Sequence, residues 1–188
     1  MNTNVERAQE HRGEMPVKVE IHTERFLLRE LTVGDVSLNY LNWLNDDEAK
    51  KWIAAAAVTK ELSDLRQYVL ARIGRDDLLF LGIFDNTNGM HIGNVKYEPL
   101  DIVHGYAVMG MLIGKREWRG KGVAEEVIQH SAAWLRQTWG IREILLGVAK
   151  DNHAAIGAYE KAGFKREQTK RIAVDPELSI SMVLHLDA

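Results

Sequence analysis

The sequence contains no cysteine among its 188 residues. A chain without cysteine fits a reducing compartment, so we expect a cytoplasmic protein. The absence also excludes any mechanism that carries an acyl group as a thioester on the protein's own cysteine. The seven histidines show no metal-ligand spacing, and with no thiolate available we predict no metal site.

Long apolar runs and a basic stripe are missing as well. No run approaches the roughly 20 apolar residues that a membrane-spanning helix needs. Residues 1–16 are polar and lack the apolar core of a secretory signal, so we expect a flexible N-terminal tail there. The net charge is -3 with both signs interspersed, which is not typical of nucleic-acid binders. We therefore expect neither a membrane nor a nucleic acid as partner, and one domain over residues 17–188.

The apolar spacing alternates between the periods of strands and helices, without an internal repeat. Thr32 with Asp35 resembles a helix N-cap, and Asp85 to Gly89 is a strong hairpin turn. This pattern predicts an α/β (α+β) domain with a mixed, mostly antiparallel sheet flanked by helices. The expected strands lie within residues 17–31, 78–84, 91–97, 106–113, 141–149 and 179–186, and the expected helices within residues 32–44, 60–74, 124–138 and 152–162.

The segment from Lys115 to Ala124 carries the strongest functional signal. It joins a buried strand to an amphipathic helix and contains Gly120 and Gly122. The first N–H groups of a helix lack partners inside the helix, and the helix dipole makes that end positive. Glycines let a bulky anion approach the backbone, so we interpret this turn as a pyrophosphate site.

Two common nucleotide motifs do not fit this turn. A Walker A loop needs Ser or Thr after Gly-Lys, but Gly122 follows Lys121. A dinucleotide fingerprint needs a third small residue where Glu125 stands. Arg119 to Ala124 instead reads Arg-x-x-Gly-x-Ala, which resembles the acetyl-coenzyme A signature of the GNAT N-acetyltransferase superfamily.

A second stretch, Asp151 to Phe164, also resembles a GNAT signature. Asn152, Tyr159 and Gly163 stand at its expected positions. The two signatures follow in the expected order, and the segments Thr23–Arg29 and Leu44–Asp46 resemble the RimJ/RimL type of that superfamily. The resemblance covers the whole expected domain.

The resemblance implies an acetyl-coenzyme A-dependent N-acetyltransferase that transfers acetyl directly to a primary amine. Tyr159 is then the acid near the thioester sulfur, and Asn152 contacts the cofactor arm. Backbone groups of a β-strand should pair with the pantetheine arm, and those of the loop should hold the pyrophosphate. The implied cofactor-binding residues are Met111, Leu112, Ile113, Arg119, Gly120, Lys121, Gly122, Val123, Ala124, Asn152 and Tyr159.

One position departs from the family pattern. RimJ/RimL-like chains often carry a glutamate two residues before a glycine in the strand preceding the loop, but Val108 stands there. His104 and Glu98 are nearby candidates for the catalytic base. The remaining possibility is that the amine loses its proton to water.

The acceptor and several aromatic roles stay open. A protein N-terminus or a small amine, such as an amino sugar, a polyamine or an antibiotic, fits the family. A non-catalytic acyl-coenzyme A sensor or scaffold is the alternative function, and the chain is expected as a monomer or homodimer. Trp43 and Trp52 either line the acceptor site or belong to the core, and Trp118 either covers the cofactor or anchors the loop.

Overall fold

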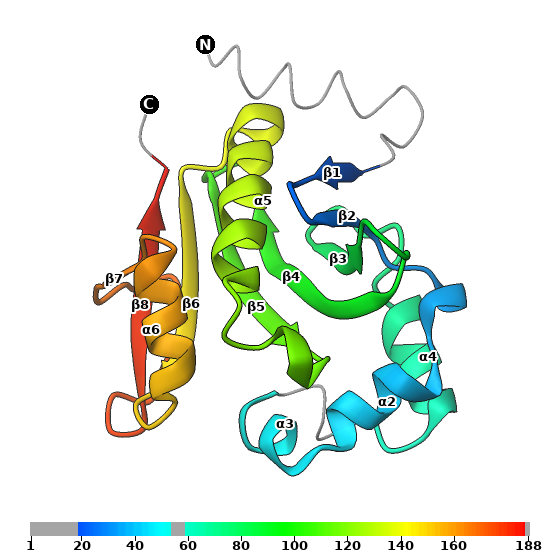
Figure 1. The fold of residues 1–188 in the computed structure, drawn as a ribbon. Coiled ribbons are helices and arrows are strands. Elements are labelled where there is room, and N and C mark those ends of the chain that lie inside the picture. Colours follow the sequence, from blue (N-terminus) through cyan, green and yellow to red (C-terminus); the bar gives the residue numbers. More distant parts are fainter. Residues whose placement is uncertain (1–18, 54–58, 187–188) are drawn as a thin grey trace.

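The computed structural model describes residues 19–53 and 59–186, and the predicted tail at residues 1–16 lies outside them. Within this part of the chain no helix is long and apolar enough to cross a lipid bilayer. Figure 1 shows the elements, whose bounds are, in chain order, β1 Glu20–His22, β2 Phe26–Glu30, the 3₁₀ turn η1 Val33–Asp35, α2 Leu38–Asn45, α3 Asp47–Trp52, α4 Leu62–Leu70, β3 Leu79–Asp85, β4 His91–Asp101, β5 Tyr106–Ile113, the 3₁₀ turn η3 Arg116–Trp118, α5 Val123–Trp139, β6 Glu143–Ala149, α6 His153–Lys161, β7 Lys165–Arg166 and β8 Ser179–His185.

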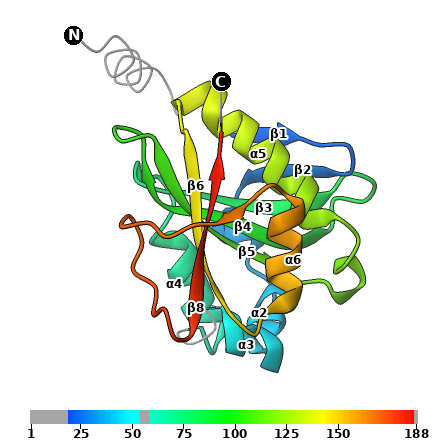
Figure 2. The same cartoon turned by 90° about the vertical axis from the view of Figure 1, so that its left-hand side faces the viewer.

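The strands form one sheet of eight in the order β1-β2-β3-β4-β5-β6-β8-β7. All neighbouring pairs are antiparallel except β5 and β6, which are parallel. The prediction of a mixed, mostly antiparallel sheet flanked by helices is therefore confirmed. Figure 2 shows α5 and α6 on one side of the sheet and α4 on the other. Because helices cover both faces, β3 is buried along its whole length.

Each face of the sheet carries its own apolar cluster. Val127 and Leu135 of α5 are completely buried on one face, together with Leu81 of β3. Phe80 points to the other face, where it packs with Leu65 of α4. Successive strand side chains alternate between the two faces, so one apolar strand supplies both clusters.

The first predicted helix begins later than expected. Thr32 and Asp35 do interact, since Asp35 Oδ2 accepts hydrogen bonds from Thr32 N and Oγ1, both at 2.8 Å. However, this pair closes only the short turn η1, and Asp35 also accepts from Arg29 of β2. The α-helix starts afterwards with its own cap, in which Ser37 Oγ accepts from Tyr40 N at 3.2 Å.

Two strand predictions need correction. β4 continues to Asp101, through residues expected to form a connection, because a bulge between Tyr97 and Leu100 absorbs the missing N–H of Pro99. The two-residue strand β7 was not predicted. It exists only through its pairing with β8, which a local pattern cannot reveal.

Candidate active site

The strands β5 and β6 run side by side only at their beginnings. Their pairing ends at Val108 and Leu145, whereas β5 stays paired with β4 as far as Ile113 and β6 with β8 as far as Ala149. Figure 1 shows the two strands diverging below α5. From Met109 onward, the edge of β5 that faces β6 has no strand partner within the described residues. Such an edge presents N–H and C=O groups to an extended ligand.

The loop between β5 and α5 leaves its backbone open. Gly120 and Gly122 adopt left-handed conformations with φ of 72° and 73°. A Cβ at Gly120 would meet no atom within 4 Å, and a Cβ at Gly122 would meet only Arg25 Nη2, at 3.7 Å. Gly122 is the N-cap of α5, so no side chain caps the first N–H groups of this helix. This geometry fits an anion at the helix N-terminus.

The side chains of the loop hold its shape. Arg119 Nε donates to Ile113 O at 3.0 Å, which fastens the loop to the end of β5. Trp118 packs edge-on against Phe26 with ring centroids 5.3 Å apart, and Lys121 Nζ lies 5.8 Å from the Trp118 ring centroid. Of the two roles left open for Trp118, the structure shows the anchoring one.

Arg25, to which the sequence pattern assigned no role of its own, reaches this loop from the turn between β1 and β2. Glu126 Oε1 accepts from Thr23 Oγ1 at 2.6 Å and from Arg25 N at 2.8 Å, and Glu126 Oε2 accepts from Arg25 Nε at 2.6 Å. Although burial acts to raise it, these bonds hold the pKa of Glu126 below its ordinary value. The negative charge of Glu126 is thus directed at Arg25, whose Nη1 also donates to Lys121 O at 2.9 Å.

The helix after β6 carries both residues of the second motif. Asn152 caps α6, since its Oδ1 accepts from Ala155 N at 3.2 Å, and its Nδ2 remains to donate elsewhere. Tyr159 packs against Phe164 with ring centroids 5.7 Å apart. Burial raises the pKa of Tyr159 to about 12, and its hydroxyl has no hydrogen-bond partner within the described residues. Tyr159 is therefore a protonated donor that a ligand can use.

His104 is not brought to this site. It lies in the turn between β4 and β5, with its side chain 70% exposed and its Nδ1 at 2.8 Å from Asp101 Oδ2. β5 then runs away from this turn, and an extended chain of this length separates His104 from Met111 by roughly 20 Å. This separation argues against His104 as the base, because the turn holds it at the far end of β5 from Met111.

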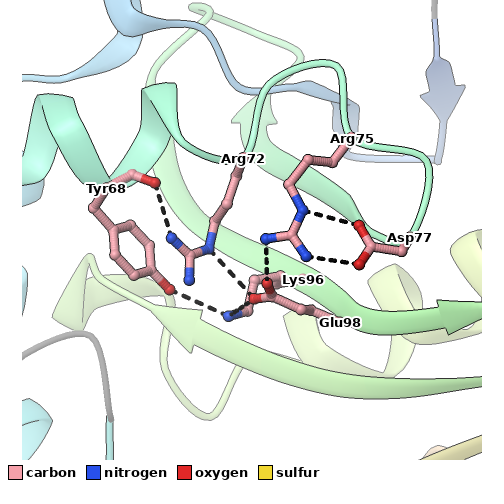
Figure 3. Close-up of polar contacts among 6 residues, drawn as sticks. All are labelled: Tyr68, Arg72, Arg75, Asp77, Lys96 and Glu98. Carbon is pink, nitrogen blue, oxygen red and sulfur yellow. Dashed lines mark hydrogen bonds and ion pairs between the residues drawn. The ribbon is translucent and has the colours of Figure 1, made fainter.

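Glu98 lies nearer but is engaged by cations, as Figure 3 shows. Its Oε2 accepts from Lys96 Nζ at 2.6 Å and from Arg72 Nε at 3.3 Å, and its Oε1 accepts from Arg75 Nη1 at 3.1 Å. Although burial acts to raise it, these cations hold the pKa of Glu98 below its ordinary value. A carboxylate that holds its proton so weakly is a poor base near neutral pH, which argues against this role for Glu98.

A cavity of about 240 Å³ borders the unpaired stretch of β5 on the side of α2 and α4. Met111 and Leu112 line it, and they also belong to the strand predicted to hold the cofactor arm. The cavity is therefore the candidate site for the acceptor amine. The described residues that line it are Tyr40, Leu44, Trp52, Ile53, Tyr68, Phe80, Asn94, Lys96, Gly110, Met111 and Leu112.

The two tryptophans near this cavity have different roles. Trp43 is only 8% exposed and packs edge-on against His91, with ring centroids 5.0 Å apart. Trp52 lines the cavity instead. Trp43 is thus a core residue, whereas Trp52 forms part of the candidate acceptor site.

The chain is similar in sequence to known proteins. A family model described as "Acetyltransferase (GNAT) domain" matches residues 25–165. An N-alpha-acetyltransferase of Saccharolobus solfataricus is 29% identical over 110 residues, which are 54% of this chain and 60% of that protein. The chain spans only 32% and 60% of the length of the two curated relatives that it matches first.

Solved structures share the fold over almost the whole chain. The ribosomal L7/L12 alpha-N-protein acetyltransferase RimL, solved with coenzyme A, superimposes with a TM-score of 0.78 at 16% identity, covering 90% of this chain and 99% of that one. A spermidine N-acetyltransferase from Vibrio cholerae, solved with coenzyme A and spermine, gives a TM-score of 0.71 at 21% identity, covering 86% and 95%. At these identities the likeness shows a common fold.

Proposed function

The chain belongs to the GNAT acetyltransferase family, and from this premise we propose that it transfers the acetyl group of acetyl-coenzyme A directly to the nitrogen of an amine. One observation carries the proposal. The unpaired edge of β5 leads through the glycine loop to the open N-terminus of α5. A ligand with an extended amide-bearing arm joined to a pyrophosphate needs these two features in series.

The residues present fit this cosubstrate. The backbone from Arg119 to Ala124 would hold the pyrophosphate, in the space that a Cβ at Gly120 or Gly122 would otherwise enter. The edge of β5 from Met111 to Ile113 would bind the pantetheine amides, with Asn152 Nδ2 as a further donor. When bound, acetyl-coenzyme A supplies a thioester whose carbonyl carbon bonds to the amine nitrogen while the carbon–sulfur bond breaks and the thiolate leaves.

Two kinds of donor on this chain would stabilise the charge that develops during the transfer. A backbone N–H of β5 near Met111 would donate to the thioester oxygen. The Tyr159 hydroxyl would donate its proton to the departing sulfur, for which its protonated state and lack of another partner suit it. Both interactions strengthen as charge develops, which is the condition for lowering the barrier.

The proton of the attacking amine would leave through water. Val108 is apolar at the position where relatives often carry a glutamate, Glu98 is held ionised by three cations, and His104 lies at the far end of β5. A single committed base is therefore not part of the proposed mechanism.

The decisive experiment is coenzyme A release with a panel of amines. The panel should contain peptides with free N-termini, an amino sugar, a polyamine and an aminoglycoside, since the solved relatives named above act on a ribosomal protein and on spermidine. We expect release with at least one acceptor. Tight acetyl-coenzyme A binding without release for any amine would instead support a non-catalytic sensor or scaffold.

We further propose that the enzyme works in the cytoplasm as a monomer or homodimer, without nucleic acid. The lack of cysteine and the interspersed charge support this. Light scattering on the purified chain measures the assembly, and a mass other than one or two protomers would contradict it.

A further inference from the structure

The polar side chains that line the acceptor cavity all carry hydrogen-bond donors. The described residues that line it include no aspartate or glutamate, and the wall is mainly aromatic and aliphatic. Its polar side chains carry the indole of Trp52, the hydroxyls of Tyr40 and Tyr68, the amide of Asn94 and the ammonium of Lys96. The state of the last three groups determines which ligand they can bind.

Asn94 is oriented by a buried histidine. His91 Nε2 lies 2.8 Å from Asn94 Oδ1 and 3.0 Å from Gly93 O. Both oxygens can only accept, so Nε2 carries the proton. The amide is thereby turned with its oxygen toward His91, and its Nδ2 has no partner within the described residues. Since Asn94 is only 4% exposed and lines the cavity, Nδ2 is placed to donate into it.

The neutral state of His91 keeps this arrangement stable. Burial lowers the pKa of His91, and the ring is enclosed by Tyr40, Trp43 and Phe84, with centroids 5.4, 5.0 and 4.8 Å away. Its Nδ1 is buried without a hydrogen-bond partner. The ring therefore acts as a fixed donor to Asn94.

Lys96 and Tyr68 add donors beside Asn94, as Figure 3 shows for their cluster. Lys96 Nζ donates to Tyr68 Oη at 3.2 Å and to Glu98 Oε2 at 2.6 Å. One N–H of Lys96 and the O–H of Tyr68 remain for a ligand. The cluster holds the three cations Arg72, Arg75 and Lys96 against the two carboxylates Asp77 and Glu98, so one positive charge is in excess.

Resting on the proposed function, we propose that the acceptor is a small amine that carries an anionic group, a carboxylate or phosphate, and no second ammonium group. Unpaired donors and an excess positive charge attract acceptor oxygens and repel a further cation. A cavity of about 240 Å³ lies just below the usual range of small-molecule sites, so the bound part of the acceptor is small. The aromatic wall would pack against the carbon chain between its two ends.

Three acceptors of matched length test the proposal with the wild-type chain. They are 4-aminobutyrate, 3-aminopropyl phosphate and 1,4-diaminobutane, which share a terminal amine and differ in the opposite group. Each is measured as a substrate by coenzyme A release and as a competitor of any acceptor found in the broader panel. We expect at least one anionic compound to exceed the diamine at least tenfold in kcat/KM or in inhibition, and the better of the two identifies the anion.

The variant Asn94→Asp tests directly whether the cavity selects for a negative charge on the acceptor. The new carboxylate still accepts from His91 Nε2 but places a negative charge in the cavity, so the preference for the anionic amine over the diamine should fall at least tenfold. The acetyl-coenzyme A Kd should stay unchanged. Gln129→Glu, on the exposed side of α5, makes the same change of charge and should leave the preference as in wild type.

The outcomes separate the two proposals. Preference for the diamine in wild type, or an unchanged preference in folded Asn94→Asp, overturns the anionic acceptor while leaving the acetyltransferase intact. If Asn94→Asp does not fold, Lys96→Met removes the excess charge and should shift the preference in the same direction. No coenzyme A release with any amine, despite acetyl-coenzyme A binding, overturns the proposed function itself.

Discussion

At the scale of single residues, Tyr159 combines a packing role with an unused polar group. Its ring contacts Phe164, while its hydroxyl has no partner within the described residues. Tyr159 is only partly buried, so a ligand can reach its hydroxyl. The hydroxyl is therefore the group to test beside the predicted thioester.

Replacing Tyr159 by Phe separates these roles. The ring still packs, so the acetyl-coenzyme A Kd should change little, while kcat should fall by about 10²–10⁴, the usual contribution of an acid. Because the pKa of Tyr159 is raised to about 12, the wild-type hydroxyl stays protonated below that pH and its donation should persist across the alkaline range of the assay. Calorimetric titration and initial rates give both values. A variant that keeps most of its kcat would show that Tyr159 only packs.

The second question about single residues is which group removes the proton from the acceptor amine. Glu98→Gln and His104→Ala should each lower kcat/KM by less than about tenfold, below the range of a committed base. The lowered pKa of Glu98 means that it is already ionised near neutral pH and contributes no rising limb there. Log kcat/KM should instead climb with pH until the acceptor's own amine is deprotonated, and the climb should move when an acceptor of different amine pKa is used.

Two results would contradict the water path. One is a hundredfold or greater fall in kcat/KM of either variant with acetyl-coenzyme A binding intact. That result would identify the replaced residue as the base. The other is a rise of log kcat/KM centred near pH 6.5, the ordinary pKa of histidine, that does not move when the acceptor is changed.

At the scale of elements, the N-terminus of α5 depends on contacts beyond its own sequence. Its two glycines supply the left-handed turn, but the Arg119 bond to Ile113 and the Trp118 contact with Phe26 fix where the turn lies. Glu126, in the first turn of the helix, would oppose an anion if it were free. Its ion pair with Arg25 offsets the repulsion between the Glu126 carboxylate and a bound anion.

Gly122→Val tests this element. A branched side chain enters the space left for the pyrophosphate and also disfavours the left-handed backbone, so acetyl-coenzyme A binding should weaken at least tenfold. Gly140→Val is the matched control, because Gly140 has φ of 66° at the other end of the same helix with no atom within 4 Å of a Cβ. Both variants should lose stability, by about 1–2 kcal/mol. If both variants fold and bind acetyl-coenzyme A with equal Kd values, the loop is not part of the cofactor site.

At the scale of the whole molecule, the sheet consists of two parts joined by a short parallel seam. Strands β1 to β5 form one part and β6 to β8 the other, and their pairing covers only Tyr106, Ala107 and Val108 of β5. The proposed cofactor would lie in the opening beyond this seam. Its binding should therefore tie the two parts together.

Hydrogen exchange and thermal unfolding measure this coupling. Acetyl-coenzyme A at about 100 times its Kd should stabilise the chain by about 2.7 kcal/mol. For a domain of this size that corresponds to a rise in Tm of about 5–11 °C. Amide protection should increase for residues 109–113 and for the first turn of α5. Stabilisation without protection at either segment would place the ligand elsewhere.

The sequence by itself determined the family and the fold class, and it predicted the segments of the proposed cofactor site. These are local properties, because a glycine turn followed by a helix, or an asparagine cap, is written in consecutive residues. Both signatures lie on the elements expected for them, and the matching family model confirms the membership.

Only the tertiary structure decided which side chains share the candidate acceptor cavity. Asn94 owes its orientation to His91, Lys96 meets Tyr68 across 28 positions of sequence, and His104 pairs with Asp101 in the turn before β5. The register of a strand sets which face each side chain occupies, and a bulge such as the one in β4 changes that register. Register and helix docking depend on contacts between distant segments, so the acceptor's chemistry could be inferred only after the chain was folded.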